Sequence, residues 1–438
     1  MKFWSVLGAV LAAALIFLPA HHALAHHEPP RTEEPAEEKP ATPAATPETT
    51  QAAKPETSPL ATQKATPAAS PEATPAASQP SAPPASLKVA SWGGAYMESQ
   101  RRAYFAPFQD ETGIAIEVFN HKGALKLLTD ENTSQKPDWD LVDLELAVLE
   151  RACAQGKLEK VNLSDLAAAG DETSAADDYL PGTLHDCGIP SVAWSSAIVF
   201  DTGAFKKAKP ATAKDFFDTK GFPGKRALPR GPKYIFELAL MADGVEPEDV
   251  YPTLATQEGA LRALEMLERL RGNIIWWDRG NEPLQALASG EATMALAFNG
   301  RIFSAIVAQN KPYDLIWDGQ VFDLDMWAIP KGTPHKSSAL KFIAFATRPE
   351  RLAAQARLFP YGPVRKSALK LIGKHPEVDA YMSDYIPTSR KNFKRALRMN
   401  ASWWEEHGAE MKEWIKIWRI GAGGSAESGS DAERENAS

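Results

Sequence analysis

The stretch Leu87-Lys-Val-Ala-Ser-Trp-Gly-Gly-Ala-Tyr96 decides the fold of this chain. Leu87, Val89 and Ser91 alternate with the residues between them, which predicts a short first strand. A Trp-Gly-Gly turn follows, and then a helical pattern. In an open α/β sheet, ligands bind outside the carboxyl ends of strands, so Trp92 and Tyr96 are placed to line a pocket. On this fragment alone, a core tryptophan beside a turn is an equally good interpretation.

Strand-like and helix-like patterns alternate along residues 87–420, which predicts an α/β fold with helices on the faces of a sheet. This core is longer than one hydrophobic core usually supports, so two lobes are expected. The further strand patterns cover 114–119, 139–142, 189–194 leading into 197–200, 294–298 and 313–317, and the helical patterns cover 236–241, 259–270, 284–287, 338–347 and 349–358.

The N-terminus predicts export. Residues 1–25 combine Lys2, an apolar run over 6–18 and an Ala-x-Ala cleavage site at 23–25, as in a secretory signal peptide. The apolar run is shorter than the roughly 20 residues of a membrane span. We therefore expect a periplasmic protein, with an uncleaved N-terminal tether as the alternative.

Two segments have the composition of disordered chain. Residues 26–86 are rich in Pro, Ala and Thr, and residues 421–438 in Gly, Ser and Glu. Neither contains enough large apolar side chains to offset the entropy of ordering. Both are acidic and carry most of the net charge of −8, so the core is nearly neutral. A nearly neutral core argues against a nucleic-acid partner, which requires a basic face.

The chain has two cysteines, Cys153 and Cys187. In an exported protein an even number of cysteines favours a disulfide, with two separate buried thiols as the alternative. The sequence contains no Gly-x-Ser-x-Gly elbow, no phosphate-binding glycine loop and no His-Glu-x-x-His motif. We therefore predict no catalytic residue, no cofactor and no metal site.

Aromatic residues recur beside charged residues or at turns. Aromatic faces attract organic cations, and a carboxylate pairs with an ammonium group. Several such groups at turn positions favour a binding pocket over simple core packing. The groups are Trp276-Trp-Asp278, Phe298-Asn-Gly-Arg301, Phe322-Asp-Leu-Asp-Met-Trp327 and Tyr361-Gly-Pro363.

Eight segments in order then suggest a family: Val-Ala-Ser-Trp-Gly-Gly-Ala-Tyr (89–96), Trp-Asp-Leu-Val-Asp (139–143), Asp-Phe-Phe-Asp (215–218), Phe-Pro-Gly-Lys-Arg (222–226), Gly-Glu-Ala-Thr-Met-Ala (290–295), Phe-Asn-Gly-Arg (298–301), Asp-Met-Trp-Ala-Ile-Pro (325–330) and Pro-Tyr-Gly-Pro (360–363). From Leu87 to about Trp418 the chain resembles the periplasmic spermidine/putrescine-binding proteins and their relatives, the solute receptors of ABC importers. The resemblance implies two α/β lobes around a ligand cleft. We place lobe 1 at about 87–199 plus 325–370 and lobe 2 at about 200–324 plus 371–420.

The resemblance also implies roles for single residues. Trp92, Tyr96 and Tyr361 match aromatic cleft positions, and Asp325 matches the acid that holds an amine. Phe298 stands where the polyamine receptors have Trp.

Other positions depart from the polyamine receptors. Gly231 and Tyr234 replace paired acids, and Asp323 stands in place of a Trp. Glu145 replaces a small hydroxyl residue, and Ala147 an aromatic one. A polyamine therefore matches poorly, and a smaller or zwitterionic amine fits better, such as an amino acid, γ-aminobutyrate or an opine-like compound.

The resulting hypothesis is a monomeric periplasmic receptor that closes its lobes on a small-molecule amine or zwitterionic ligand and delivers it to an ABC transporter permease in the inner membrane. Arg301 is expected to clamp a ligand carboxylate, unless it pairs with Asp278 or Asp323. A secreted enzyme acting on an amine or glycan and a tethered scaffold without a ligand are the alternatives. The candidate ligand-binding residues are Trp92, Tyr96, Glu145, Trp277, Phe298, Arg301, Asp323, Asp325 and Tyr361.

Overall fold

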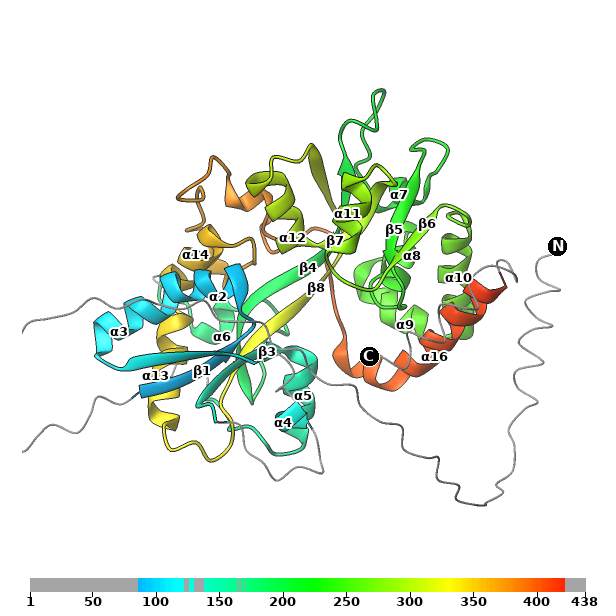
Figure 1. Ribbon diagram of the computed structural model, residues 1–438. Helices are drawn as coiled ribbons and strands as arrows, with labels where there is room; N and C mark the ends of the chain where they lie inside the picture. The colour runs from blue at the N-terminus through cyan, green and yellow to red at the C-terminus, as the bar shows by residue number, and fades with distance from the viewer. Residues whose placement is uncertain are drawn as a thin grey trace, which may run out of the picture. The chain divides into compact units, whose positions relative to one another are not determined.

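In a computed structural model of the chain, the structure describes residues 86–421 except 122–125, 130–137, 163, 165, 167 and 170. The expected signal peptide lies outside these residues, as do the Pro-rich segment up to residue 85 and the tail after residue 421. The described part contains one nine-stranded mixed sheet in the order β2-β1-β3-β8-β4-β7-β5-β6, with β9 paired to β8 (Figure 1).

The strands follow the apolar runs of the sequence. They are β1 (Ser86–Ser91), β2 (Ala115–Asn120), β3 (Leu141–Glu145), β4 (Gly188–Asp201), β5 (Lys225–Pro229), β6 (Ile274–Trp277), β7 (Ala292–Phe298), β8 (Tyr313–Ala328) and β9 (Leu397–Arg398). Strands β1, β2 and β3 are parallel to one another, and so are β5, β6 and β7. The long strands β4 and β8 lie between these two groups and run antiparallel to each other, β4 also to β7 and β8 also to β3, whereas the short β9 pairs with β8 in parallel.

The helices cover the sheet. They are α2 (Gly94–Gln100), α3 (Ala106–Thr112), α4 (Lys126–Thr129), α5 (Leu146–Ala154), α6 (Ala175–Asp178), α7 (Ala213–Phe217), α8 (Ile235–Ala242), α9 (Val250–Leu254), α10 (Gln257–Glu268), α11 (Glu282–Ala288), α12 (Asn299–Phe303), α13 (Lys336–Ala346), α14 (Pro349–Leu358), α15 (Lys366–Leu369) and α16 (Ala401–Ile420). Helix α14 begins at a proline, as the sequence predicts. No helix in the described residues has the length and hydropathy required to cross a membrane.

Two strands are longer than the sequence suggested. The patterns at 189–194 and 197–200 form one strand of 14 residues, and the pattern at 313–317 is the start of a strand of 16 residues. The pairing of β4 with β8 shifts register between Ser196 and Ile198, and such an irregularity breaks the alternation that marks a strand. The second half of β8 was not predicted as a strand, because it contains Asp323 and Asp325 and aspartate is rare in strands.

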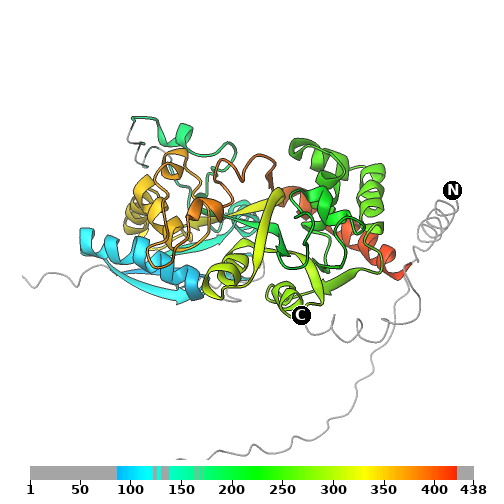
Figure 2. The ribbon, with the colours of Figure 1, turned by 90° about the horizontal axis from the view of Figure 1, so that it is seen from above.

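The hydrophobic core has separate clusters on the two sides of the long strands. One cluster joins residues between Leu87 and Ala193 to residues between Phe322 and Ala368, and Phe393 also packs against it. A second cluster joins residues from Ile198 to Val321 with Leu397 to Trp418, and a third lies between Ala197 and Tyr313. A small fourth cluster joins Phe303 and Ala356 to Ala380, Met382 and Ile386. Figure 2 shows the two corresponding groups of helices, connected by the long strands. This is the two-lobe α/β fold that the sequence predicted, although the lobe boundaries remain predictions.

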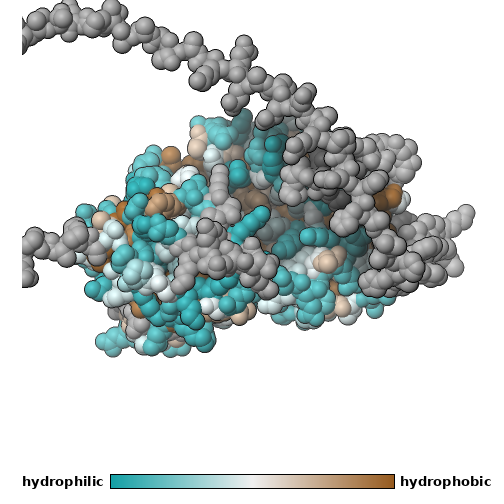
Figure 3. Space-filling model, turned by 60° about the horizontal axis from the view of Figure 1, so that its bottom comes forward, coloured by the Kyte–Doolittle hydropathy of each residue, from teal (hydrophilic) through white to brown (hydrophobic). Residues whose placement is uncertain are grey.

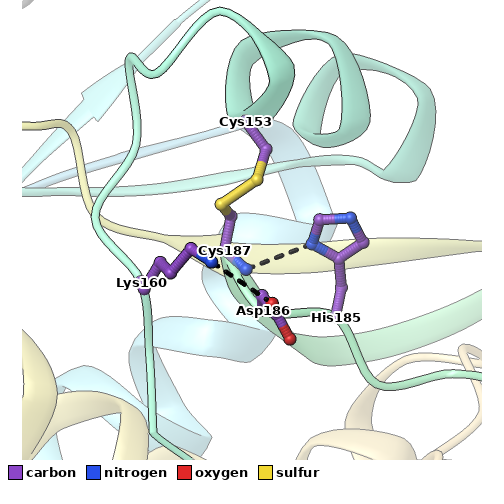
Figure 4. Close-up of a disulfide and its surroundings, with 5 residues drawn as sticks. All are labelled: Cys153, Lys160, His185, Asp186 and Cys187. Carbon is purple, nitrogen blue, oxygen red and sulfur yellow. Dashed lines mark hydrogen bonds and ion pairs between the residues drawn. A yellow bond between two sulfur atoms is a disulfide. The ribbon is translucent and has the colours of Figure 1, made fainter.

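The predicted disulfide is confirmed (Figure 4). Cys153 in α5 is bonded to Cys187, which directly precedes β4, and their Cα atoms lie 5.9 Å apart. Nδ1 of His185 accepts the amide N–H of Cys187 at 3.1 Å. These three side chains have metal-ligand chemistry, but both sulfur atoms are committed to the disulfide. The bond therefore ties the end of α5 to the start of a long strand.

Candidate functional site

Four carboxylates lie on one face of two neighbouring strands. In the antiparallel pairing of β3 with β8, Glu145 stands directly opposite Asp325. Side chains two residues apart in a strand point to the same face. Asp143 and Glu145 therefore share a face of the sheet with Asp323 and Asp325. We call these four residues the carboxylate cluster.

Asp143 is the internal member of the cluster and is fully buried. Its Oδ2 accepts hydrogen bonds from Tyr96 Oη at 2.8 Å and Gln100 Nε2 at 2.7 Å, with a longer one from Ser91 Oγ at 3.4 Å. Its Oδ1 accepts a bond from Ser191 Oγ at 2.8 Å. These donors satisfy the carboxylate, so Asp143 orients Tyr96 and is not free for a ligand.

The other three carboxylates are much less satisfied. Asp325 is 3% exposed and accepts Trp194 Nε1–H at 3.2 Å. Asp323 is 6% exposed and accepts only the amide of Leu324, at 2.8 Å, among the described residues. Glu145 accepts no hydrogen bond from a described residue and is half-buried. Buried carboxylates without a paired cation favour the binding of a positive group.

Burial raises the pKa of every member of the cluster. The pKa of Asp143 rises to about 6 and that of Asp323 to about 7, mainly through desolvation of the charged form. The pKa of Asp325 lies well above its usual value, first through burial and then through repulsion by Asp143, Glu145 and Asp323. The pKa of Glu145 is raised by burial as well. A ligand ammonium would relieve this repulsion.

Aromatic rings from both lobes lie around the cluster. Trp194 in β4 packs edge-on against Phe298, with ring centroids 5.6 Å apart. Phe298, at the end of β7, also contacts Trp277, at the end of β6, at 6.0 Å. From the other lobe, Tyr96 packs against Tyr361 at 5.1 Å. Trp277 and Phe298 thus stand at carboxyl ends of strands, where α/β sheets bind ligands.

Tyr234 belongs to the same aromatic group. It directly precedes α8 with φ at 71°, in the left-handed region that a bulky side chain rarely adopts. Its ring lies 5.8 Å from Phe298 and 6.5 Å from Trp194. Backbone strain of this kind is common where a binding site needs a particular side-chain direction.

Arg301, the predicted carboxylate clamp, does not pair with Asp278, which was one of its two alternative partners. Asp278 pairs with Arg230, with Nε and Oδ1 3.1 Å apart, and not with Arg301. Arg301 lies exposed in α12 and makes no ion pair with a described residue. Its charge opposes the burial that raises the pKa of Tyr361, which places the guanidinium near that ring. A carboxylate near Tyr361 would find Arg301 available.

The structure brings most of the predicted residues together, and Trp92 is linked to the cluster through His121. Trp92 packs edge-on against His121 at 4.5 Å, and Nε2 of His121 donates to the carbonyl of Asp143 at 2.8 Å. Sequence reasoning missed Trp194, because a tryptophan inside an apolar strand resembles core. It also missed Tyr234 as an aromatic contact, although its position was noted.

A surface hollow of about 570 Å³, lined by residues 244–262 of the loop after α8, of α9 and of the first half of α10, offers no competing site of this chemistry. Its lining includes acids such as Glu246, Asp249 and Glu258 but no aromatic ring. The face drawn in Figure 3 is mostly hydrophilic, with scattered hydrophobic residues. The carboxylate cluster and its rings remain the best candidate site.

Comparisons with known proteins agree with this architecture. The gamma-aminobutyric acid-binding protein of Pseudomonas aeruginosa is 37% identical over 332 residues, which cover 76% of this chain and 90% of that protein. The spermidine/putrescine-binding periplasmic protein of Escherichia coli is 24% identical over 62% of this chain and 76% of that protein. The solved structure of the Atu4243 GABA receptor matches with a TM-score of 0.61 and 28% identity, over 78% of this chain and 99% of that one.

The model of the bacterial extracellular solute-binding protein family matches residues 103–382. This match spans more than half of the chain and confirms the resemblance seen in the sequence motifs. The chain belongs to the bacterial extracellular solute-binding protein family.

Proposed function

We propose that this protein is the periplasmic receptor of an ABC importer and binds a small ligand that carries one ammonium and one carboxylate group, such as γ-aminobutyrate. The observation that carries the proposal is Glu145 standing opposite Asp325 in register, with Asp323 on the same face. These three carboxylates, flanked by rings, suit an ammonium group. Arg301 suits the carboxylate end, because a guanidinium can hold it with two bonds.

The relatives support this choice of ligand. Two of the matched proteins are named for γ-aminobutyrate, and the first shares 37% identity with this chain. The two lobes would close on the ligand, and an inner-membrane permease would take it up. Within this proposal the protein is exported, performs no catalysis and acts as a monomer.

A polyamine such as putrescine is the second candidate ligand. The observation in its favour is the number of carboxylates, since three unpaired acids exceed the need of one ammonium group. The matched Escherichia coli protein is named for spermidine and putrescine. Affinity for both ligand classes must therefore be measured side by side.

Isothermal titration calorimetry with γ-aminobutyrate, other amino acids, putrescine and spermidine tests the proposal. We expect saturable binding of an amino acid by the wild type, with no new product in the mixture after prolonged incubation. Asp325→Asn should weaken this binding about 30-fold, which corresponds to about 2 kcal/mol for a lost charge-assisted pair. Lys341→Met, on the exposed side of α13, is the matched control. Turnover of the ligand would refute the proposal that the protein is a receptor. Tight binding of polyamines alone would refute the proposal that its ligand is a zwitterion.

A further inference from the structure

Asn299, the first residue of α12, connects three segments that lie far apart in the chain. Its side chain is 1% exposed. Its Oδ1 accepts the amide N–H of Ser195 in β4 at 3.0 Å, and its Nδ2 donates to the carbonyl of Pro360 at 2.6 Å. A longer contact of 3.5 Å joins Nδ2 to the carbonyl of Tyr385. This buried amide therefore uses both of its ends, and it reaches the loop that carries Tyr361.

The bond to Pro360 fixes the segment that carries the Tyr361 ring. The amide N–H of Tyr361 donates to the carbonyl of Phe359 at 2.8 Å, which closes a γ-turn with Pro360 at its centre. Gly362 exchanges two backbone hydrogen bonds with Ala193 in β4, at 2.7 and 2.8 Å. The backbone on both sides of Tyr361 is thus held, by β4 on one side and by the asparagine amide on the other.

The start of α12 lies directly against the same loop. A Cβ atom at Gly300 would stand 3.2 Å from Cε1 of Tyr361 and 3.3 Å from Cε1 of Phe359, so the helix backbone and these rings are in close contact. The next residue in α12 is Arg301, the predicted carboxylate clamp. Tyr361 itself is half-buried, so part of its ring remains accessible to a ligand. The place of the ring relative to the clamp therefore depends on how this loop is fixed to α12.

We propose that Asn299 is a positioning residue, whose side-chain amide sets the place of the Tyr361 ring relative to Arg301 and thereby the affinity for the ligand. The part that concerns affinity rests on the proposed function, because it concerns the same site. Without the Nδ2 donor, the carbonyl of Pro360 loses a buried hydrogen bond, and the backbone that carries the ring is no longer fixed in one position. A ring that is fixed before the ligand arrives costs less entropy on binding, so its release weakens affinity.

The test removes the donor and keeps the acceptor. In Asn299→Asp a carboxylate oxygen, which accepts but does not donate, replaces Nδ2, and the other oxygen still accepts the bond from β4. Asn392→Asp is the matched control, because Asn392 is also buried and its Nδ2 donates to the carbonyl of Ile386 at 2.8 Å. The side-chain bonds that the described structure gives Asn392 all go to residues 383–386.

Two readouts follow the ring and the ligand separately. Fluorine NMR of protein labelled with fluorotyrosine, without ligand, reports the surroundings of each tyrosine ring, and the Tyr361 resonance is the one lost in Tyr361→Phe. We expect this resonance to shift or broaden in Asn299→Asp and to stay in place in Asn392→Asp. In calorimetry, the affinity for γ-aminobutyrate should fall about tenfold in Asn299→Asp alone, which is the weight of one ring against a ligand cation.

Two further variants separate the ring from charge. Asn299→Ala removes the donor without adding a charge, and it should reproduce both effects. In a Tyr361→Ala background, Asn299→Asp should cost little further affinity, because the asparagine acts through that ring.

Several results would overturn the inference. They are a Tyr361 resonance that does not change in either Asn299 variant, an equal change in Asn392→Asp, and losses of affinity that add fully in the double variant. Melting curves show whether each variant is folded, and Asn299→Ala takes the place of Asn299→Asp if that one is not. If the wild type binds neither γ-aminobutyrate nor putrescine while the resonance moves as expected, the proposed function fails and the positioning of Tyr361 by Asn299 stands.

Discussion

Ligand binding by the wild-type protein should strengthen about tenfold between pH 6 and pH 8, because Asp323 must lose a proton to hold an ammonium group. Burial raises the pKa of this carboxyl to about 7 in the ligand-free protein. An ammonium beside it would bring the pKa back towards the usual range. An amino acid such as γ-aminobutyrate keeps both charges over this interval, since ordinary carboxyl and alkylammonium groups have pKa values near 4 and 10.

The magnitude follows from the protonated fraction of Asp323. At pH 6 this carboxyl is about nine-tenths protonated and at pH 8 about one-tenth, so binding releases about 0.9 and about 0.1 proton. Integrating this release over two pH units gives about a tenfold change in affinity, or about 1.4 kcal/mol. Glu145 and Asp325, whose pKa values are also raised, would add to the change with the same sign.

Calorimetry of γ-aminobutyrate binding in two buffers of different ionisation enthalpy counts the released protons directly. The observed enthalpy should depend on the buffer at pH 6 and much less at pH 8. In Asp323→Asn, the share of the pH dependence that comes from this residue should be lost. An affinity that stays flat from pH 6 to pH 8, with enthalpies independent of buffer, would refute the reasoning.

Three further predictions concern the clamp, the disulfide and a buried acid. Arg301→Ala should weaken binding of an amino acid about 30-fold, or about 2 kcal/mol, in calorimetry, because a charge-assisted pair is lost; unaltered affinity would leave the ligand carboxylate without this partner. Replacing Cys153 and Cys187 by Ala should lower the free energy of unfolding by about 3–4 kcal/mol in urea, because the bond closes a loop over a sequence separation of 34; an unchanged midpoint would contradict this. Glu237 has a pKa raised by burial to about 7, so the wild type loses stability as pH rises from the ordinary value near 4.5 through 7. Glu237→Gln should therefore equal the wild type near pH 4 and exceed it by about 3 kcal/mol at pH 8 in denaturant titrations, and equal stabilities at pH 8 would count against the shift.

The sequence predicted the fold well because buried strands and amphipathic helices leave local patterns. The disulfide was equally accessible, since an exported chain with two cysteines leaves one pairing. The sequence could not show that Glu145 lies directly opposite Asp325, because the register of two strands far apart in the chain is set by tertiary pairing.

The two largest hydrophobic clusters each join two segments that lie far apart in the chain, and this arrangement sets the order in which folding can finish. A chain that emerges from its N-terminus presents residues 87–193 long before Phe322 to Ala368, which complete the same cluster. The cluster that begins at Ile198 waits still longer for Trp403, Trp404 and Trp418 of α16. Contacts so distant in sequence make folding slow. The nascent protein therefore exposes apolar surface until α16 is available, and the packing of α16 is the last step that buries the core of the second lobe.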